Sequence, residues 1–245
     1  AAAPQLFDIS ITIFPPAYSG LPPRSGRPED RRLFALYGSR VTVAANVEPN
    51  ELALQLRMNP GRPLPMSAEA SGRRSVSFTL RERVTCYLEG TIGDTVARSA
   101  QWTMQPEADS APVVHLTSPS GDVTLEVAGP VPVSVTASDD FLVSAVGLHC
   151  RLEGEQQWRS LPLQVRPGAM VSAGAQLNPT ALGLVAGRAL LLRAWATDND
   201  TVSGPKTAIS AMVTIRLGGG EVGDRGRSAT AQAERQQADA FAQLQ

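Results

Sequence analysis

The chain has 245 residues, of which 22 are basic and 23 acidic, with a formal net charge of −1 and 42% hydrophobic side chains. This length accommodates one or two domains, and so few charges exclude a solvated, disordered polymer. A net charge near zero provides no global basic field and disfavours a nucleic-acid-binding function. No apolar run approaches the roughly 18 residues of a membrane-spanning helix, so we expect any export signal or membrane anchor to lie outside this sequence.

The first part of the chain is predicted to be an all-β sandwich over residues 5–106. Between residues 39 and 47 every second residue is apolar, which is the period of a half-buried strand; these residues are Val41, Val43, Ala45 and Val47. Between such bursts lie Pro-, Gly- and Asn-rich segments, in which Pro presets φ and Gly or Asn accepts a positive φ. No helical period interrupts this pattern.

A short acidic and proline-containing segment, residues 105–112, precedes a second series of alternating strands. Seven or eight short strands with regular turns are typical of an immunoglobulin-like sandwich, and we predict one over residues 110–217. The two halves share the string Asp-Thr-Val, at 94–96 and 200–202, after comparable strands. The sequence therefore predicts a tandem pair of related immunoglobulin-like sandwiches.

The C-terminal part is predicted to be a Gly-rich linker over residues 218–227 and the start of a helical or coiled-coil region over 228–245. Ser228 can cap that helix, and Ala, Gln, Glu and Arg favour it. Gly218, Gly220 and Gly223 form a literal G-x-G-x-x-G string. A dinucleotide site also needs a parallel βαβ unit, which the pattern does not provide, so we interpret the string as linker.

No catalytic motif accompanies the candidate nucleophiles and bases, and we predict that the chain is not an enzyme. Cys86 and Cys150 are 64 residues apart without a metal-ligand spacing and are predicted to be buried free thiols. His115 and His149 each lie within a strand-like run. Adjacent strand residues point to opposite faces of a sheet, so His149 and Cys150 cannot form a dyad.

Acidic turns in the second half are the sharpest chemical signal. Asp139 and Asp140 directly follow one strand, and Asp198 and Asp200 follow another. In an immunoglobulin-like sandwich these turns share the end where the chain enters, so the linker acids Glu107 and Asp109 should approach them. Such a cluster of carboxylates suits Ca²⁺. The alternative is that these acids only cap their own turns.

Two other features have both a structural and a binding interpretation. The proline-rich loop around Tyr18 favours an edge-protecting crossover, with a polyproline ligand as the alternative. The three tryptophans, Trp102, Trp158 and Trp195, are interpreted as core residues. Clustering of two of them on an exposed face would instead favour a carbohydrate-binding sandwich.

The strings ITIFPPAYSGLPPR, DSAPVVHLTSP, VTASDDFLVSAVGL and RAWATDNDTVSGPKTAIS resemble the extracytoplasmic region of large, mostly uncharacterised bacterial cell-envelope proteins. In that group a P-P-x-Y-[ST]-G-L-P string opens an immunoglobulin-like domain, a D-D-F-G-[LI] turn marks the next, and a long helical region follows. The resemblance covers residues 7–217, and Leu142 departs from it at the family's Gly. It implies a membrane anchor outside this sequence, exposure to the periplasm or cell surface, and association with MoxR-type ATPase systems.

The acidic turns are also similar to those of cadherin-like repeats, which clamp Ca²⁺ between consecutive domains. The linker PEADSAP lacks that family's D-x-N-D-N string. This similarity implies Asp139, Asp140, Asp198 and Asp200 as calcium ligands.

Together these patterns predict a non-catalytic extracytoplasmic structural or protein-interaction module, tethered to the membrane, with protein partners in the cell envelope. No nucleic acid and no small-molecule substrate is expected. Two alternatives stay open: a Ca²⁺-rigidified cadherin-like adhesion module and a carbohydrate-binding β-sandwich.

Overall fold

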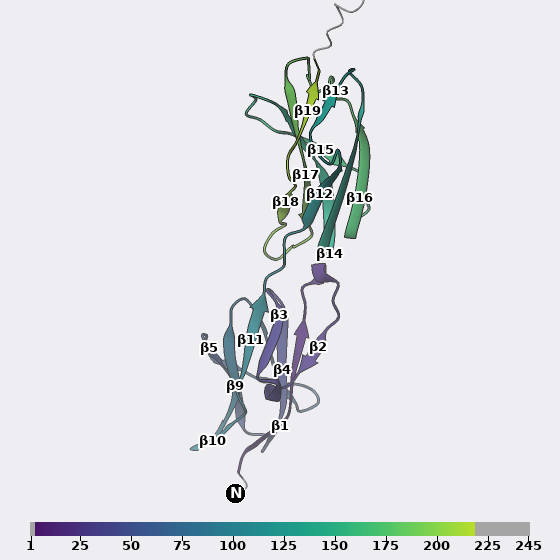
Figure 1. Cartoon of the computed structure of the whole chain (residues 1–245). Coiled ribbons are helices and arrows are strands. Elements are labelled where there is room, and N and C mark those ends of the chain that lie inside the picture. Colours follow the sequence, from purple (N-terminus) through teal and green to yellow (C-terminus); the bar gives the residue numbers. More distant parts are fainter. Residues whose placement is uncertain (1–2, 219–245) are drawn as a thin grey trace, which may run out of the picture.

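The computed structural model describes residues 3–218, which form β-strands and two single-turn 3-10 helices (Figure 1). The strands make two sandwiches, each around its own apolar core. The core of domain 1 draws on residues between Ile11 and Met104, and that of domain 2 on residues between Val114 and Ile215. The predicted all-β fold of tandem immunoglobulin-like sandwiches is thus confirmed.

Domain 1 has one sheet of order β2-β1-β4-β8-β7 and another of order β3-β11-β9-β5-β6, with β10 paired to β9. Its elements are β1 (Gln5–Phe14), η1 (Ala17–Ser19), β2 (Arg24–Gly26), η2 (Pro28–Asp30), β3 (Arg32–Leu36), β4 (Arg40–Glu48), β5 (Ala53–Asn59), β6 (Leu64–Pro65), β7 (Ser67–Ala68), β8 (Arg74–Thr79), β9 (Val84–Ile92), β10 (Thr95–Arg98) and β11 (Trp102–Glu107).

The alternation read from the sequence decides which side chains enter this core. In β4, Val41, Val43 and Ala45 are completely buried, while the intervening residues face the other side of the sheet. A strand places successive side chains on opposite faces, so a period of two buries one complete face. Trp102 in β11 is also in this core, with 1% of its surface exposed.

In domain 2 the strand order is β12-β14-β17-β19-β13, with β15 and β16 paired to β14 and β18 paired to β17. Its strands are β12 (Val113–Ser118), β13 (Val123–Leu125), β14 (Val131–Leu152), β15 (Arg159–Leu163), β16 (Gly168–Leu177), β17 (Ala189–Asp198), β18 (Thr207–Ile209) and β19 (Val213–Leu217). The sequence predicted two strands separated by a turn where the structure has the single long strand β14. Its first part pairs with β12 and β16 and its second part with β15 and β17, the change falling between Ser138 and Val143.

The two domains share one parallel strand pairing. In each, a short early strand pairs in parallel with the last strand: β3 with β11 in domain 1, and β13 with β19 in domain 2. The other pairs are antiparallel within the described residues. This common feature agrees with the tandem repeat inferred from the sequence.

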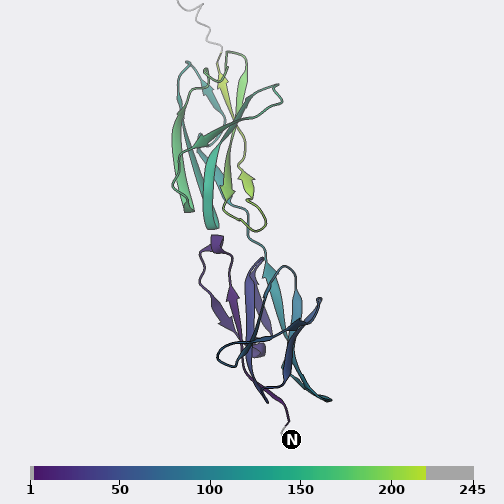
Figure 2. The same cartoon turned by 180° about the vertical axis from the view of Figure 1, so that it is seen from behind.

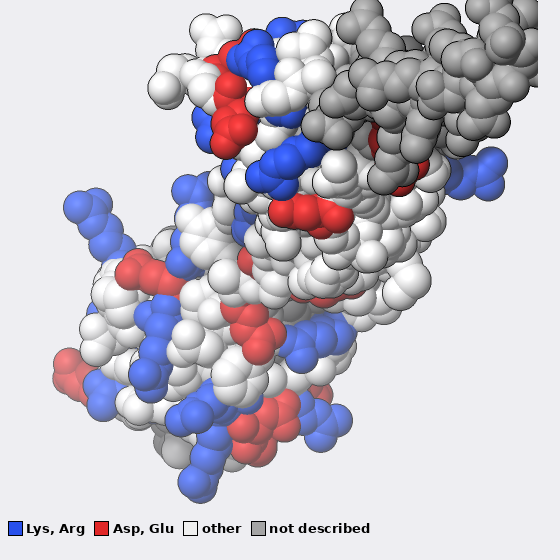
Figure 3. Space-filling model, turned by 45° about the horizontal axis from the view of Figure 1, so that its top comes forward, with Lys and Arg blue, Asp and Glu red and all other residues white. Residues whose placement is uncertain are grey.

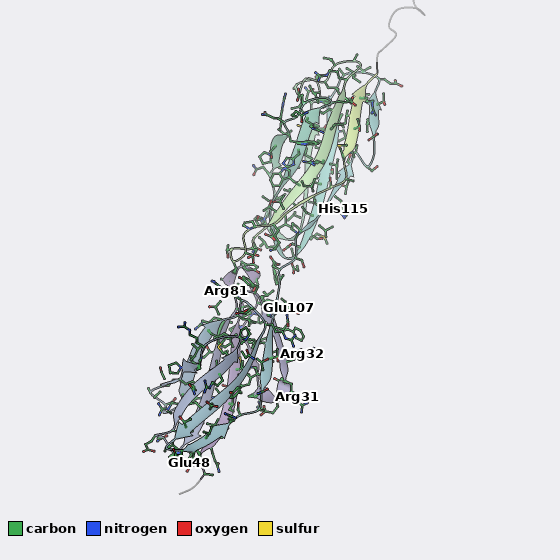
Figure 4. The ribbon with its side chains drawn as sticks, turned by 90° about the vertical axis from the view of Figure 1, so that its left-hand side faces the viewer. Arg31, Arg32, Glu48, Arg81, Glu107 and His115 are labelled. Carbon is green, nitrogen blue, oxygen red and sulfur yellow. The ribbon has the colours of Figure 1, made fainter. Side chains whose placement is uncertain are left out.

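The domains lie end to end, and residues 108–112 connect β11 to β12 (Figures 1 and 2). In both views η1, at the tip of the β1–β2 hairpin, reaches the base of β14. Glu107 and Arg81 lie at the end of domain 1 that faces domain 2, and Glu48 lies at the opposite end (Figure 4).

The predicted Gly-rich linker beyond Gly218 and the helix start at 228–245 lie outside the described residues. Within residues 3–218, no helix has the length and apolar character needed to cross a bilayer. On the face seen in Figure 3, basic and acidic side chains are interspersed over both domains.

Candidate functional site

The Asp-Asn-Asp segment at the end of β17 is folded back on itself by its own carboxylates. One oxygen of Asp198 accepts the backbone N–H groups of Asp200 (3.1 Å) and Lys206 (2.9 Å). One oxygen of Asp200 accepts those of Val202 (2.7 Å) and Ser203 (3.0 Å). The turn-capping interpretation therefore describes one oxygen of each acid, and the other is left for a further partner.

That further partner is an ammonium group. Nζ of Lys206 lies 2.7 Å from Asp200, 2.9 Å from Asp109 and 3.4 Å from Asp198. The three carboxylate side chains are at most 2% exposed, whereas that of Lys206 is 27% exposed. We call these four residues the Lys206 cluster. Buried carboxylates need a paired charge, and here the chain supplies it from the loop before β18.

Burial and hydrogen bonding shift the pKa values of the Lys206 cluster in opposite directions. Burial raises the pKa of Asp200, but hydrogen bonds from Lys206, Ser203 and Val202 outweigh it and bring that pKa below its usual range. Burial dominates at Asp109, whose pKa is raised despite the bond from Lys206. Burial lowers the pKa of Lys206, but its bonds to Asp200 and Asp109 prevail and raise that pKa. The lysine therefore stays protonated at neutral pH.

The other predicted acids are not in contact with this ammonium. Asp139 uses one oxygen to accept the N–H groups of Phe141 (3.0 Å) and Leu142 (2.9 Å) and so caps the corner of β14. Asp140 and Glu107 line a neighbouring pocket. Of the six acids expected to converge, the structure brings Asp109, Asp198 and Asp200 onto Lys206.

This arrangement does not fit Ca²⁺ while Lys206 is in place, because a divalent ion would meet a positive charge at the centre of its oxygen ligands. In residues 3–218 no group of three or more His, Cys, Asp or Glu side chains is disposed to hold a metal ion.

The proline-rich loop of domain 1 docks on the same loops of domain 2. The side-chain amide of Asn199 donates a hydrogen bond of 2.8 Å to the backbone carbonyl of Tyr18. The ring of Tyr18 meets that of Phe141 edge to face, with 5.8 Å between centroids. Burial, with the nearby charges of Asp109 and Asp200, raises the pKa of Tyr18 to about 12. The predicted crossover loop is therefore an interdomain contact.

A second contact joins the turn between β3 and β4 to the loop after β17. A Cβ atom placed on Gly38 would lie 2.5 Å from Cγ1 of Val202, and Gly38 has a φ of +84°. Both the close approach and the positive φ require glycine here. The neighbouring Tyr37 N–H donates to the carbonyl of Glu107 (2.8 Å), which ties this turn to the beginning of the linker.

A largely apolar pocket of about 620 Å³ opens beside these interdomain contacts. We call the contacts of Tyr18, Gly38, Phe141, Asn199 and Val202, together with this pocket, the joint. Its wall comes from the β1–β2 hairpin, from β3 and from the corner of β14, and includes Ile13, Leu21, Phe34, Leu36 and Phe141. Leu21 is 50% and Phe34 41% exposed. The joint thus presents apolar surface to solvent.

The remaining candidate residues divide between core and surface. Cys86 and Cys150 are buried free thiols, as predicted, and burial raises the pKa of Cys86 to about 12. His115 is exposed on β12, and His149 lies on the outer face of β14. Trp102 is in the core, but Trp158 and Trp195 are not: both pack near His149 on that outer face. The core prediction is therefore wrong for these two tryptophans.

Sequence reasoning missed Lys206. It is the single lysine among 22 basic residues, and no sequence motif marks it. The signal was its position six residues after Asp200, in the same loop as the acids. A lysine that returns to its own acidic turn can supply the charge that a metal otherwise provides.

No protein-family model matches this sequence, and no curated protein sequence matches it. Among solved structures it is similar to a pair of titin Ig domains, with 10% identity over 76% of this chain and 91% of that chain and a TM-score of 0.25. It is also similar to the N-terminal Ig module of a Drosophila receptor protein tyrosine phosphatase, with 8% identity, 88% and 99% coverage and a TM-score of 0.28.

A further match is trypsin-activated alpha-2-macroglobulin from Escherichia coli, with 12% identity, coverage of 85% of this chain and 15% of that chain, and a TM-score of 0.29. The two sheets of domain 1, and the strand order of domain 2, are themselves those of immunoglobulin-like sandwiches.

Proposed function

We propose that this chain is a non-catalytic structural and protein-interaction module of a membrane-tethered bacterial envelope protein, whose two domains act as one stiff rod. The observation that carries the proposal is where the family-like strings lie. PPAYSGLP supplies Tyr18, the DDF corner supplies Phe141, and DND supplies Asn199. Tyr18 contacts both of the others, Asn199 through its backbone carbonyl and Phe141 through its ring. The residues that make the sequence distinctive thus build the joint.

The joint is held from several directions, which is what a stiff connection requires. The Tyr18 loop contacts both acidic turns, the Gly38 turn abuts Val202, and the linker residue Asp109 is paired with Lys206. Connections between domains are mobile unless their interface is substantial. The Tyr18 loop and the Gly38 turn thus hold domain 2 at two separate places, and the Asp109–Lys206 pair anchors the linker to domain 2.

A Ca²⁺-rigidified adhesion module remains the alternative prediction. It would require Lys206 to leave the acids so that oxygen ligands could surround the ion. Because the Lys206 ammonium already pairs with these acids, calcium should be dispensable for stiffness.

Distance measurements between two spin labels test the stiff joint. Glu51→Cys in domain 1 and Glu126→Cys in domain 2 provide exposed sites, and the buried native thiols should not react. We expect one narrow distance distribution in EDTA, unchanged by millimolar Ca²⁺. Asn199→Ala should broaden it, whereas Gln101→Ala, an exposed control, should not.

A broad distribution in the unaltered joint would overturn the proposal. A distribution that narrows only with Ca²⁺, together with a raised thermal midpoint, would support the calcium alternative. Labelling of Glu51→Cys in intact cells, with a maleimide that cannot cross the inner membrane, tests the proposed location separately. Protection of that thiol would contradict an extracytoplasmic position.

A further inference from the structure

The outer face of the β15-β14-β17 layer in domain 2 carries a compact cluster of aromatic and basic side chains. His149 lies close to both indoles: its ring centroid is 6.0 Å from that of Trp195 and 6.4 Å from that of Trp158. His149 is also the direct cross-strand partner of Arg193. We call this cluster the Trp face; its members are His149, Arg151, Trp158, Arg193 and Trp195.

The indole of Trp195 lies over the neighbouring strand β14 at a point where that strand has no side chain. Its cross-strand partner is Gly147, and a Cβ atom there would lie 2.6 Å from Cε2 and Cζ2 of Trp195. The indole therefore rests on the backbone of β14, where a side chain would otherwise lift it. Trp195 stays half-buried, with part of its surface in solvent.

Two guanidinium groups flank the second indole. The Cζ atoms of Arg193 and Arg151 lie 4.0 Å and 4.7 Å from the ring centroid of Trp158, within the range of cation–π contacts. Within residues 3–218 neither arginine is paired with a carboxylate, and the Nε–H of each is out of solvent without a hydrogen-bond acceptor. Burial and the charge of Arg193 lower the pKa of His149. Nη1 of Arg151 donates a hydrogen bond of 3.0 Å to the backbone carbonyl of Glu155, so among the described residues the two guanidinium groups contact an indole and a backbone carbonyl but no carboxylate.

A polar pocket of about 380 Å³ lies at the edge of this face, lined by Glu155, Gln156, Gln157, Trp158 and Arg159. Its side-chain amides and charged groups can both donate and accept hydrogen bonds. Trp158 gives this pocket one aromatic wall, and the other four lining residues are polar or charged.

We propose that the Trp face and this pocket bind an acidic glycan, a carbohydrate that carries carboxylate groups. A sugar ring can pack its apolar C–H surface against the indole of Trp195. Its hydroxyl groups can form hydrogen bonds with the side-chain amides of Gln156 and Gln157. Its carboxylate would supply the anion that the guanidinium groups of Arg151 and Arg193 lack.

A protein partner fits these observations less well. Protein interfaces concentrate their binding energy in apolar, fully desolvated centres, whereas the pocket beside Trp158 is lined by two glutamines, a glutamate and an arginine. This site lies on domain 2 alone, so the inference does not depend on the stiff joint.

Titration calorimetry of the whole chain with a galacturonic acid trisaccharide tests the proposal, with the uncharged galactose trisaccharide and a glutamate peptide as comparison probes. The acidic sugar should bind, and the neutral one at least about tenfold more weakly, since a charge-assisted hydrogen bond is lost. Arg193→Gln and Trp195→Ala should each weaken binding about tenfold or more. Arg166→Gln, an exposed arginine on the same domain, is the control and should bind normally.

Trp195→Phe keeps an aromatic ring over Gly147 and should retain partial binding. This second variant keeps the test valid if Trp195→Ala loses binding because it misfolds. Absence of sugar binding at millimolar concentration would overturn the proposal. So would equal affinity for the glutamate peptide, which would identify a general acidic-peptide surface, or binding that Arg193→Gln leaves unchanged.

Discussion

The ammonium nitrogen of Lys206 lies 2.9 Å from the carboxylate of Asp109, although the two residues are 97 positions apart. Asp109 belongs to the five-residue linker and Lys206 to the loop before β18. The pair therefore fixes where the chain enters domain 2. Because the same ammonium also pairs with Asp198 and Asp200, one side chain contacts both the acidic turn and the linker.

Replacing that ammonium by an apolar side chain should destabilise the protein strongly. Lys206→Met keeps much of the stem but leaves three buried carboxylates without a cation, and breaking a buried ion pair costs about 3 kcal/mol or more. The free energy of unfolding in urea measures this loss. Arg216→Met is the matched control: it is 52% exposed and lies 3.8 Å from Asp122, so it should change stability by less than about 1 kcal/mol. Equal effects of the two variants would contradict a central role for Lys206.

The Lys206 cluster should also extend stability toward alkaline pH. The folded pKa of Lys206 lies above its usual 10.5, so its contribution is complete below pH 10.5 and is lost as pH rises through the folded value. Tyr18, with a pKa of about 12, should likewise stay protonated beyond pH 10. Urea unfolding at several pH values up to 10.5 should show no loss of unfolding free energy from the Lys206 cluster. The difference in tyrosinate absorbance between the wild type and Tyr18→Phe reports the titration of Tyr18. Titration of Tyr18 near pH 10 would contradict the partial burial that raises the pKa of Tyr18 at the joint.

Sequence periodicity predicted the sandwiches because it reports local burial directly. In β17, Leu190, Leu192 and Ala194 alternate into the core. The same strand shows what was overlooked: Trp195 is two residues from Arg193 and so shares its outward face. A tryptophan in phase with arginine is a surface residue, whereas Trp102, in phase with Met104, is core.

The joint was less accessible to sequence reasoning, for a physical reason. Turn chemistry located the acids, but the partner of a charge depends on how separate loops meet in space. Lys206 and Tyr18 contact the acidic turns only through folding of the loop before β18 and docking of the β1–β2 hairpin. Contacts between separate loops produce no periodic pattern of apolar residues in the sequence, so periodicity cannot predict them.

Domain 1 has its own charge cluster, which should set its acid sensitivity. Glu89 on β9 lies 2.7 Å from Arg57 and 2.9 Å from Arg98, and their hydrogen bonds lower its pKa below the usual 4.5. Its contribution is therefore complete above pH 4.5 and is lost as pH falls through the folded pKa. Glu89→Gln should lower the thermal midpoint at pH 7 and flatten its decline below pH 4.5. Glu82→Gln, an exposed control, should leave the curve unchanged; parallel wild-type and Glu89→Gln curves would argue against this pairing.

Gly147→Ala tests the geometry of the Trp face without removing any of its members. The added methyl would lie 2.6 Å from Trp195 and from the carbonyl oxygen of Leu161. Such overpacking lowers the free energy of unfolding by about 1–3 kcal/mol. Because the backbone oxygen cannot yield as a side chain can, Trp195 must lift from the sheet, and its fluorescence should shift as its exposure rises. Gly121→Ala is the control: no atom lies within 4 Å of its added Cβ, so stability and fluorescence should remain close to wild type. If Gly147→Ala behaved like Gly121→Ala, Trp195 would not lie against β14, and the flat indole surface inferred for ligand binding would be lost with it.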